Sequence, residues 1–143
     1  MRILYDYAMS FVGTPYRWGG DDSIDGFDCS GFVQELLMSA GEDPEGDQTA
    51  QGLFNWFSSM GRARHDVWDL GSLIFFGESV TKITHIGFLL DAYRMVEAGG
   101  GGSATKTIKD AAEQNAFIRV RLIESRKDKV AILKPYYRRI GMI

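Results

Sequence analysis

The chain contains a single cysteine, Cys29, within the stretch GFDCSGFVQELLMSAG at residues 26–41. This stretch predicts that Cys29 lies in the first turn of an amphipathic helix. A thiol at that position faces the positive end of the helix dipole and unpaired backbone N–H groups, which lower its pKa and raise the thiolate fraction. Because the thiolate is the reactive form, Cys29 is a candidate nucleophile. The small residues Ser30 and Gly31 predict an open turn, where a substrate could approach and N–H groups could stabilise an oxyanion.

A nucleophilic thiol also needs a base, and His85 is the candidate. His85 begins the strand-like stretch HIGFLLD, so its ring could be presented at the end of a sheet beside the start of a helix. The alternative role for Cys29 is structural, because free cysteines are among the most buried residues and behave as small hydrophobes. Sequence alone leaves this choice open, because it depends on whether the two side chains meet.

The elements that would position these side chains divide the chain into a helical front half and a strand-rich back half. Apolar residues recur at helical spacing over residues 3–12 and 29–37, and a third helix is predicted within 49–61. Asp28 can cap the second helix, and Gly41 suits the position just after its end. Stretches rich in branched and aromatic residues predict strands at 72–76, 84–91, 94–98, 116–123 and 129–134.

Length and connectivity predict one α+β domain that covers residues 1–143. A chain of 143 residues with 45% hydrophobic and 24% charged residues has the size and composition of a single globular unit. The short separations between the predicted strands favour antiparallel pairing, and helices followed by strands are typical of the α+β class. The run GGGGS at 99–103 lies between strand-like segments and predicts a mobile turn.

Charge and composition exclude several classes of partner. The formal net charge of -3 gives no reason to expect binding to nucleic acid or to an anionic membrane surface. One cysteine cannot form an internal disulfide, and with two histidines the chain falls short of a structural zinc site, so no metal or cofactor is expected. Tyr5 and Asp6 interrupt any apolar stretch at the N-terminus, so we expect no signal peptide, no membrane span and a cytoplasmic location as synthesised.

Three stretches together resemble the successive motifs of NlpC/P60 cysteine peptidases, a papain-like group that cleaves bacterial cell-wall peptides. They are GTPYRWGGDDSIDGFDCSGFVQELLMSAG, then GSLIFFG, then THIGFLLDAYRMVEA, and together with the N-terminal helix the match covers roughly residues 1–98. The resemblance is specific because a Pro-Tyr-x-Trp-Gly-Gly loop, an Asp-Cys-Ser-Gly turn and a His-Ile-Gly strand occur in the order of the family. It implies a papain-like fold in which N-terminal helices pack on a central antiparallel β-sheet.

The resemblance also implies roles for individual residues. Cys29 would be the nucleophile and His85 the general base, with Glu97 at a third position where the family commonly has histidine. A carboxylate can perform that role, because it accepts a hydrogen bond from the imidazole and stabilises the imidazolium; the alternative is that Glu97 is simply an exposed strand residue. Tyr16 would lie near the oxyanion. The implied substrate-binding residues are Asp28, Ser30 and Trp18, although Asp28 and Ser30 could equally serve in helix capping.

The implied activity is hydrolysis of the stem peptide of peptidoglycan through a cysteine thioester, at the γ-D-glutamyl to diamino-acid bond and with no cofactor. A bare catalytic domain of this kind could act on the wall after release, or within a phage tail or lysis apparatus, and a phage or prophage role is favoured. Two alternatives stay open. One is a catalytically degenerate module that binds wall peptides or serves as a structural part of a phage tail, and the other is an amidase or acyltransferase that uses the same Cys-His chemistry.

Overall fold

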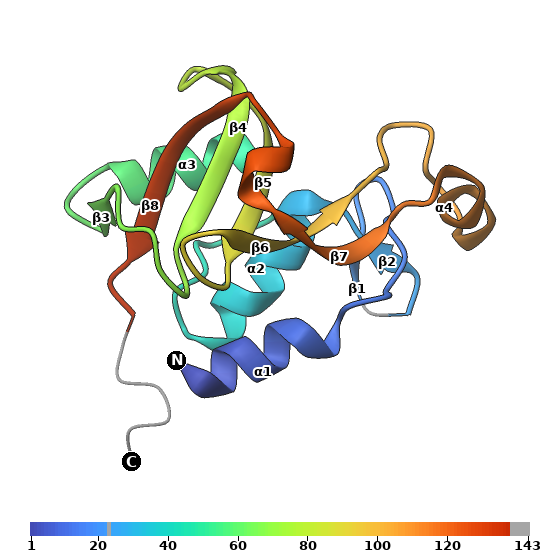
Figure 1. Ribbon diagram of the computed structural model, residues 1–143, viewed down its shortest axis with the longest axis horizontal. Coiled ribbons are helices and arrows are strands. Elements are labelled where there is room, and N and C mark those ends of the chain that lie inside the picture. Colours follow the sequence, from blue (N-terminus) through green and yellow to red (C-terminus); the bar gives the residue numbers. More distant parts are fainter. Residues whose placement is uncertain (23, 138–143) are drawn as a thin grey trace.

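The computed structural model describes residues 1–22 and 24–137 and has helices on one side of a central sheet (Figure 1). The helices are α1 (Arg2–Ser10), α2 (Cys29–Ser39), α3 (Ala50–Ser58) and α4 (Ile108–Gln114), with a short 3-10 turn η1 (Ile123–Ser125). The strands are β1 (Asp21–Asp22), β2 (Gly26–Phe27), β3 (Ala63–His65), β4 (Leu73–Ser79), β5 (Lys82–Leu89), β6 (Arg94–Gly99), β7 (Phe117–Leu122) and β8 (Lys129–Pro135).

The central sheet has six strands in the order β3-β8-β4-β5-β6-β7. All of its neighbouring strands pair antiparallel, which confirms the predicted pairing and the α+β class. The last strand, β8, lies between β3 and β4, so both of these strands pair with a segment that is distant in sequence. The ladder between β5 and β6 is short and joins only Phe88 with Val96 and Leu89 with Met95.

Alternation along β4 explains why both faces of this sheet are buried. Leu73 and Phe75 point into the main core beneath the helices, whereas Ile74 and Phe76 point to the other face. On that other face they form a smaller core with Leu89, Met95, Ile123 and Ile132. The sheet is therefore a rigid platform, packed by helices on one side and by the turn η1 on the other.

The helix that carries Cys29 begins and ends as the sequence predicts. Asp28 is its N-cap, and the Asp28 carboxylate accepts a hydrogen bond from the backbone N–H of Gly31 at 2.7 Å. Gly41 follows the C-cap with φ at +72°, a left-handed conformation that glycine adopts without strain. The helix α2 packs against both β5 and β6. This packing places the start of the helix beside the two strands that carry the other candidate residues.

Several elements differ from the prediction. The helix α4 was not predicted, although Thr107 and Asp110 form a reciprocal capping box at its start and such a box is a readable signal. The short strands β1, β2 and β3 were also missed, because they contain only two or three residues each. His85 does not open its strand, since β5 starts three residues earlier at Lys82. Among the described residues, no helix has the length and apolarity needed to cross a bilayer.

Candidate active site

Cys29 is the first residue of α2 and lines a cleft of about 330 Å³. Its thiol is half-buried and free. At the first position of a helix, the N–H groups of the opening turn have no partner within the helix. The position is thus the one that the sequence predicts for a nucleophile, and the side chain is accessible from the cleft.

His85 lies on β5 beside Cys29 and is almost completely buried, at 8% exposed. Its Nε2 atom lies 2.9 Å from Oε2 of Glu97, which leaves the other ring nitrogen for Cys29, a side chain close enough to raise the pKa of His85. Burial by itself lowers the pKa of His85, but the hydrogen bonds to Cys29 and Glu97 and their negative charges raise it from 6.5 to about 9. Cys29, His85 and Glu97 therefore form one connected polar chain.

Glu97 on β6 is fully buried, and both of its carboxylate oxygens have partners. Oε2 faces His85, while Oε1 accepts a hydrogen bond from Nη1 of Arg121 at 3.3 Å. Burial opposes ionisation, but the hydrogen bond to His85 and the charges of His85, Arg121 and Arg126 outweigh it and hold the pKa of Glu97 below its ordinary value. The alternative of an exposed strand residue is wrong for Glu97.

Tyr16 is buried at the edge of the same cleft. Burial, and then the negative charges of Cys29 and Asp28, raise the pKa of Tyr16 far above its ordinary range. Its phenol thus keeps its proton and can donate a hydrogen bond. The backbone of Gly101 lies so close to Tyr16 that an added Cβ atom at position 101 would collide with the ring.

The glycine run at 99–102 therefore packs against residues of the cleft, a role that the prediction of a mobile turn did not include. Residues 99–102 line the same cleft as Cys29. At Gly99, an added Cβ atom would lie only 2.5 Å from Oε2 of Glu97. Small residues are needed here because the backbone itself packs against two of the candidate site residues.

The surroundings of Cys29 correct the expectation of an open turn. Gly31 is buried, and its N–H is taken by the Asp28 carboxylate. A Cβ atom at position 31 would also collide with the carbonyl oxygen of Gly20, so Gly31 is small in order to pack against the preceding loop. Ser30 is 6% exposed, and its hydroxyl donates to Asp28 at 3.3 Å.

Asp28 therefore caps the helix, and the Ser30 hydroxyl bonds the Asp28 carboxylate. Asp28 also accepts a hydrogen bond from the N–H of Gly19 at 3.2 Å, and burial raises its pKa in spite of its hydrogen bonds. Neither Asp28 nor Ser30 lines the cleft, whereas Trp18 does and is 54% exposed. Of the three residues predicted to bind substrate, Trp18 has the most accessible side chain.

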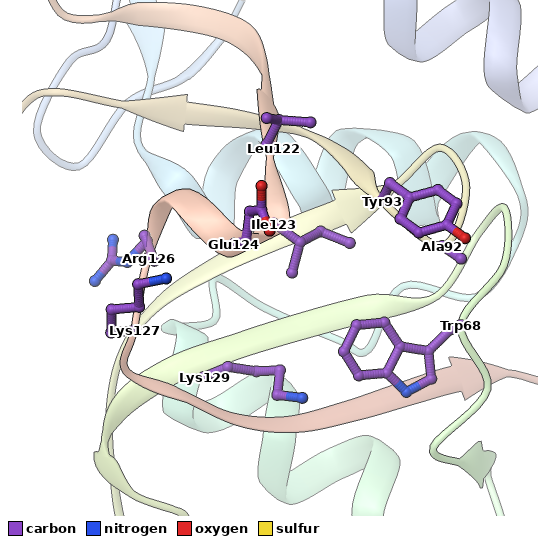
Figure 2. Close-up of a pocket in the computed structure, with 9 residues that line it drawn as sticks. All are labelled: Trp68, Ala92, Tyr93, Leu122, Ile123, Glu124, Arg126, Lys127 and Lys129. Atoms are coloured by element: carbon purple, nitrogen blue, oxygen red, sulfur yellow. The ribbon is translucent and has the colours of Figure 1, made fainter.

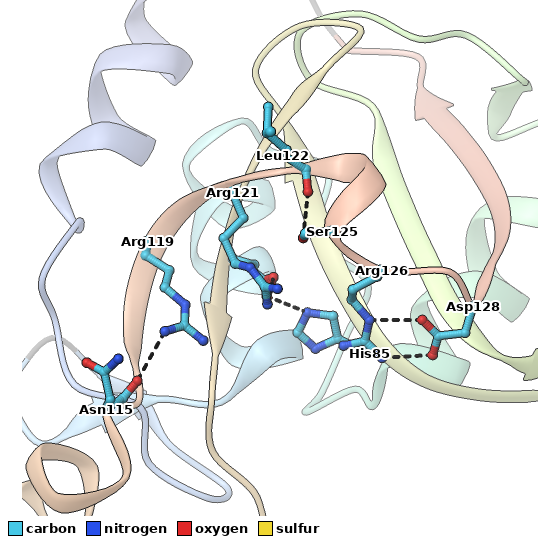
Figure 3. A network of polar contacts seen from close by, with 9 residues as sticks. His85, Asn115, Arg119, Arg121, Leu122, Ser125, Arg126 and Asp128 are labelled. Atoms are coloured by element: carbon cyan, nitrogen blue, oxygen red, sulfur yellow. Dashed lines mark hydrogen bonds and ion pairs between the residues drawn. The ribbon is translucent and has the colours of Figure 1, made fainter.

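Two arginines in the cleft were not singled out from the sequence. Arg121 on β7 and Arg126, just after η1, both line the cleft with Cys29. Figure 3 shows the two arginines near His85. Arg126 donates to both carboxylate oxygens of Asp128, at 3.0 and 2.8 Å, and lies over the ring of Phe76. The alternation in FIRVRL is the one signal for Arg121, and it predicts only that two arginines share a face of the strand.

A second and larger cavity, of about 670 Å³, is lined by Trp68, Tyr93 and three basic residues (Figure 2). It shares Arg126 with the cleft but contains neither a thiol nor a histidine. The candidate nucleophile Cys29 and the candidate base His85 line the smaller cleft, so we place the candidate active site there. Within residues 1–22 and 24–137, no group of three or more His, Cys, Asp or Glu side chains is arranged to hold a metal ion.

The model of the NlpC/P60 family matches residues 13–122, a range that includes all three residues of this candidate site. The chain belongs to the NlpC/P60 family. It is 32% identical over 105 residues to the bifunctional muramidase/DL-endopeptidase CwlT of Bacillus subtilis, and this match covers 71% of this chain and 30% of CwlT. It is 30% identical over 103 residues to the gamma-D-glutamyl-L-lysine dipeptidyl-peptidase of Bacillus subtilis, covering 68% of this chain and 32% of that protein.

Solved structures show the same fold. The P60 domain of an antigen from Mycobacterium avium subspecies paratuberculosis has a TM-score of 0.60 at 25% identity, over 94% of this chain and 95% of that one. An NlpC/P60 family protein from Bacillus cereus has a TM-score of 0.71 at 18% identity, over 94% of this chain and 39% of that one. The chain thus spans less than a third of the two curated relatives named above and nearly all of the isolated P60 domain.

Proposed function

We propose that this chain is a cysteine endopeptidase that hydrolyses the stem peptide of peptidoglycan. The observation that carries the proposal is the connected chain from the half-buried Cys29 thiol through His85 to the buried Glu97 carboxylate. A module that only binds wall peptides has no need of a nucleophile placed beside a base. Membership of the NlpC/P60 family supports the same conclusion.

The proposed mechanism uses each of these groups at a stated atom. Because the pKa of His85 is about 9, its imidazole holds a proton at neutral pH, and this positive charge favours attack by the thiolate form of the neighbouring sulfur. The sulfur attacks the peptide carbonyl, and the backbone N–H of Cys29 and the hydroxyl of Tyr16 stabilise the oxyanion. His85 then gives its proton to the leaving amine, and water hydrolyses the thioester with His85 as the base. Glu97 holds the ring in place throughout.

The bond that we propose lies between γ-D-glutamate and the diamino acid. The support comes from the names of two relatives, a DL-endopeptidase and a gamma-D-glutamyl-L-lysine dipeptidyl-peptidase. We propose that the exposed Trp18 at the cleft contacts the peptide, with Asp28 and Ser30 beneath it. A place for the chain in a phage particle or lysis apparatus, and its cytoplasmic location as synthesised, stay predictions from the sequence.

The experiment is product analysis on purified muropeptides by mass spectrometry. The parent protein should release fragments that end in γ-D-glutamate, and Cys29→Ala should release none while unfolding at a similar temperature. Binding of muropeptides without cleavage by the parent would favour the wall-peptide-binding alternative. Cleavage at the amide that joins the peptide to the sugar, or transfer to an added amine, would favour the amidase or acyltransferase alternative.

A further inference from the structure

We propose that Arg121 is a positioning residue that binds the second carboxylate oxygen of Glu97, keeps this buried group ionised and thereby holds the other oxygen on His85. This inference rests on the proposed function, since it assumes that Glu97 serves His85 in catalysis. It goes beyond that function by giving the Cys-His-Glu chain a fourth member. The family pattern does not supply this residue, because a histidine at position 97 would carry no negative charge to balance.

The strand register shows that the contact is specific. In the ladder between β6 and β7, Arg119 is directly opposite Glu97, and Arg121 is two residues further along, opposite Met95. Both arginines share the face of the sheet that carries Glu97. Nevertheless, the Arg119 guanidinium turns away and donates to the backbone carbonyl of Asn115 at 3.1 Å, as Figure 3 shows. The diagonal neighbour Arg121 reaches Glu97 instead.

A carboxylate at this position needs such a partner. Glu97 is fully buried, and Gly99 packs so closely that an added Cβ atom would lie 2.5 Å from its Oε2. An ionised carboxylate without compensating partners is costly in a protein interior, and it takes up a proton instead. The Arg121 side chain is 31% exposed, so it can bind Glu97 with one nitrogen while its remaining N–H groups face the solvent of the cleft.

Charged or titratable side chains face Glu97 from β5, from β7 and from the segment just after η1. His85 on β5 bonds one oxygen, and Cys29 at the start of α2 lies beyond the imidazole. Arg121 on β7 bonds the other oxygen, while Arg126 acts over a longer distance and is itself engaged by Asp128. Among the described residues, Arg121 is the one cation bonded to Oε1, so its removal leaves that oxygen without a charged partner there, and we expect Glu97 to take up a proton at a higher pH.

The test is a double-mutant cycle in Arg121→Gln and Glu97→Gln, read at several pH values by two measurements. The first is kcat on a muropeptide, and the second is the rate at which iodoacetamide alkylates Cys29. We expect Arg121→Gln to lower kcat and the alkylation rate about 5- to 10-fold at pH 6. At pH 8 each of the two rates should fall by no more than about 2-fold, because Glu97 ionises again at the higher pH. In the Glu97→Gln background, Arg121→Gln should change neither rate by more than about 2-fold, because no ionisable carboxylate remains.

Two further variants control this cycle. Arg121→Lys keeps a cation near the carboxylate and should recover most of the activity at pH 6. Arg119→Gln removes the same charge from the same strand, at a residue that does not bond Glu97, and should leave the acid side of the profile unchanged. The alkylation arm needs no substrate, so it tests Arg121 even if the muropeptide assay shows that the proposed function is wrong.

Three results would overturn the inference. A raised KM with an unchanged alkylation profile would show that Arg121 binds substrate. A lowered unfolding temperature with the pH profile of the parent would show a role in stability alone. An equal effect of Arg121→Gln in the presence and absence of the Glu97 carboxylate would show that the arginine acts on some other group.

Discussion

Replacement of Glu97 by glutamine tests how strongly the buried carboxylate stabilises the protonated form of His85. Glutamine has nearly the same shape and can still accept a hydrogen bond, but it has no charge. The pKa of His85 rises from 6.5 to about 9 through its contacts with Cys29 and Glu97, against the effect of burial. This rise corresponds to roughly 3 kcal/mol in favour of the imidazolium. If the two partners contribute equally, the carboxylate accounts for about half of it.

The expected result is a shift of the alkaline side of the pH profile. The imidazolium must give a proton to the leaving amine, so kcat/KM of the parent should fall as the pH rises through about 9. In Glu97→Gln this fall should occur about one to two pH units lower. At pH 8.5 the variant should be about 10-fold slower than the parent.

The assay is kcat/KM on a purified muropeptide between pH 5 and pH 10, with thermal unfolding to confirm that each variant is folded. Glu113→Gln is the matched control, because it removes a carboxylate from an exposed position of α4 and should leave the profile unchanged. If the alkaline side of Glu97→Gln coincides with that of the parent and the rates are equal, then Glu97 does not stabilise the imidazolium. The third member of the site would then have to be another group.

The remaining predictions concern the nucleophile, the cleft wall and stability. Cys29→Ala should abolish cleavage and lower the unfolding temperature by no more than a few degrees, and residual turnover above about 1% would contradict a covalent mechanism. Gly101→Ala should lower kcat/KM at least 10-fold because its Cβ atom displaces the Tyr16 ring, whereas Gly102→Ala, with no atom within 4 Å of its added Cβ, should stay within about 2-fold of the parent. Equal effects of the two variants would argue against this account. Because the pKa of His85 is raised on folding, its stabilising contribution is complete below about pH 6.5 and is lost as the pH rises through about 9. Chemical denaturation should show a loss on the order of 2 kcal/mol over that range, and His85→Gln should remove most of this loss.

The sequence by itself determined the features that depend on local chemistry. Helical periodicity, the Asp28 cap and the glycine after the helix define α2 and place Cys29 in its first turn. Alternation of branched and aromatic residues predicts the main strands and, with short turns, their antiparallel pairing. The order of the three motifs was enough to indicate the family. These signals can be read from sequence because each involves residues that are close neighbours in the chain.

Tertiary structure alone decided which distant side chains meet. Periodicity assigns Arg119 and Arg121 to the same face of β7, but only the register and the rotamers select Arg121 as the partner of Glu97. The insertion of β8 beside β3 and the packing of the glycine run against Tyr16 likewise depend on contacts between segments far apart in sequence. Such contacts are selected by the packing of the whole core, because a buried charge or a close backbone contact is tolerated only where its neighbours fit. No pattern of neighbouring residues encodes that fit.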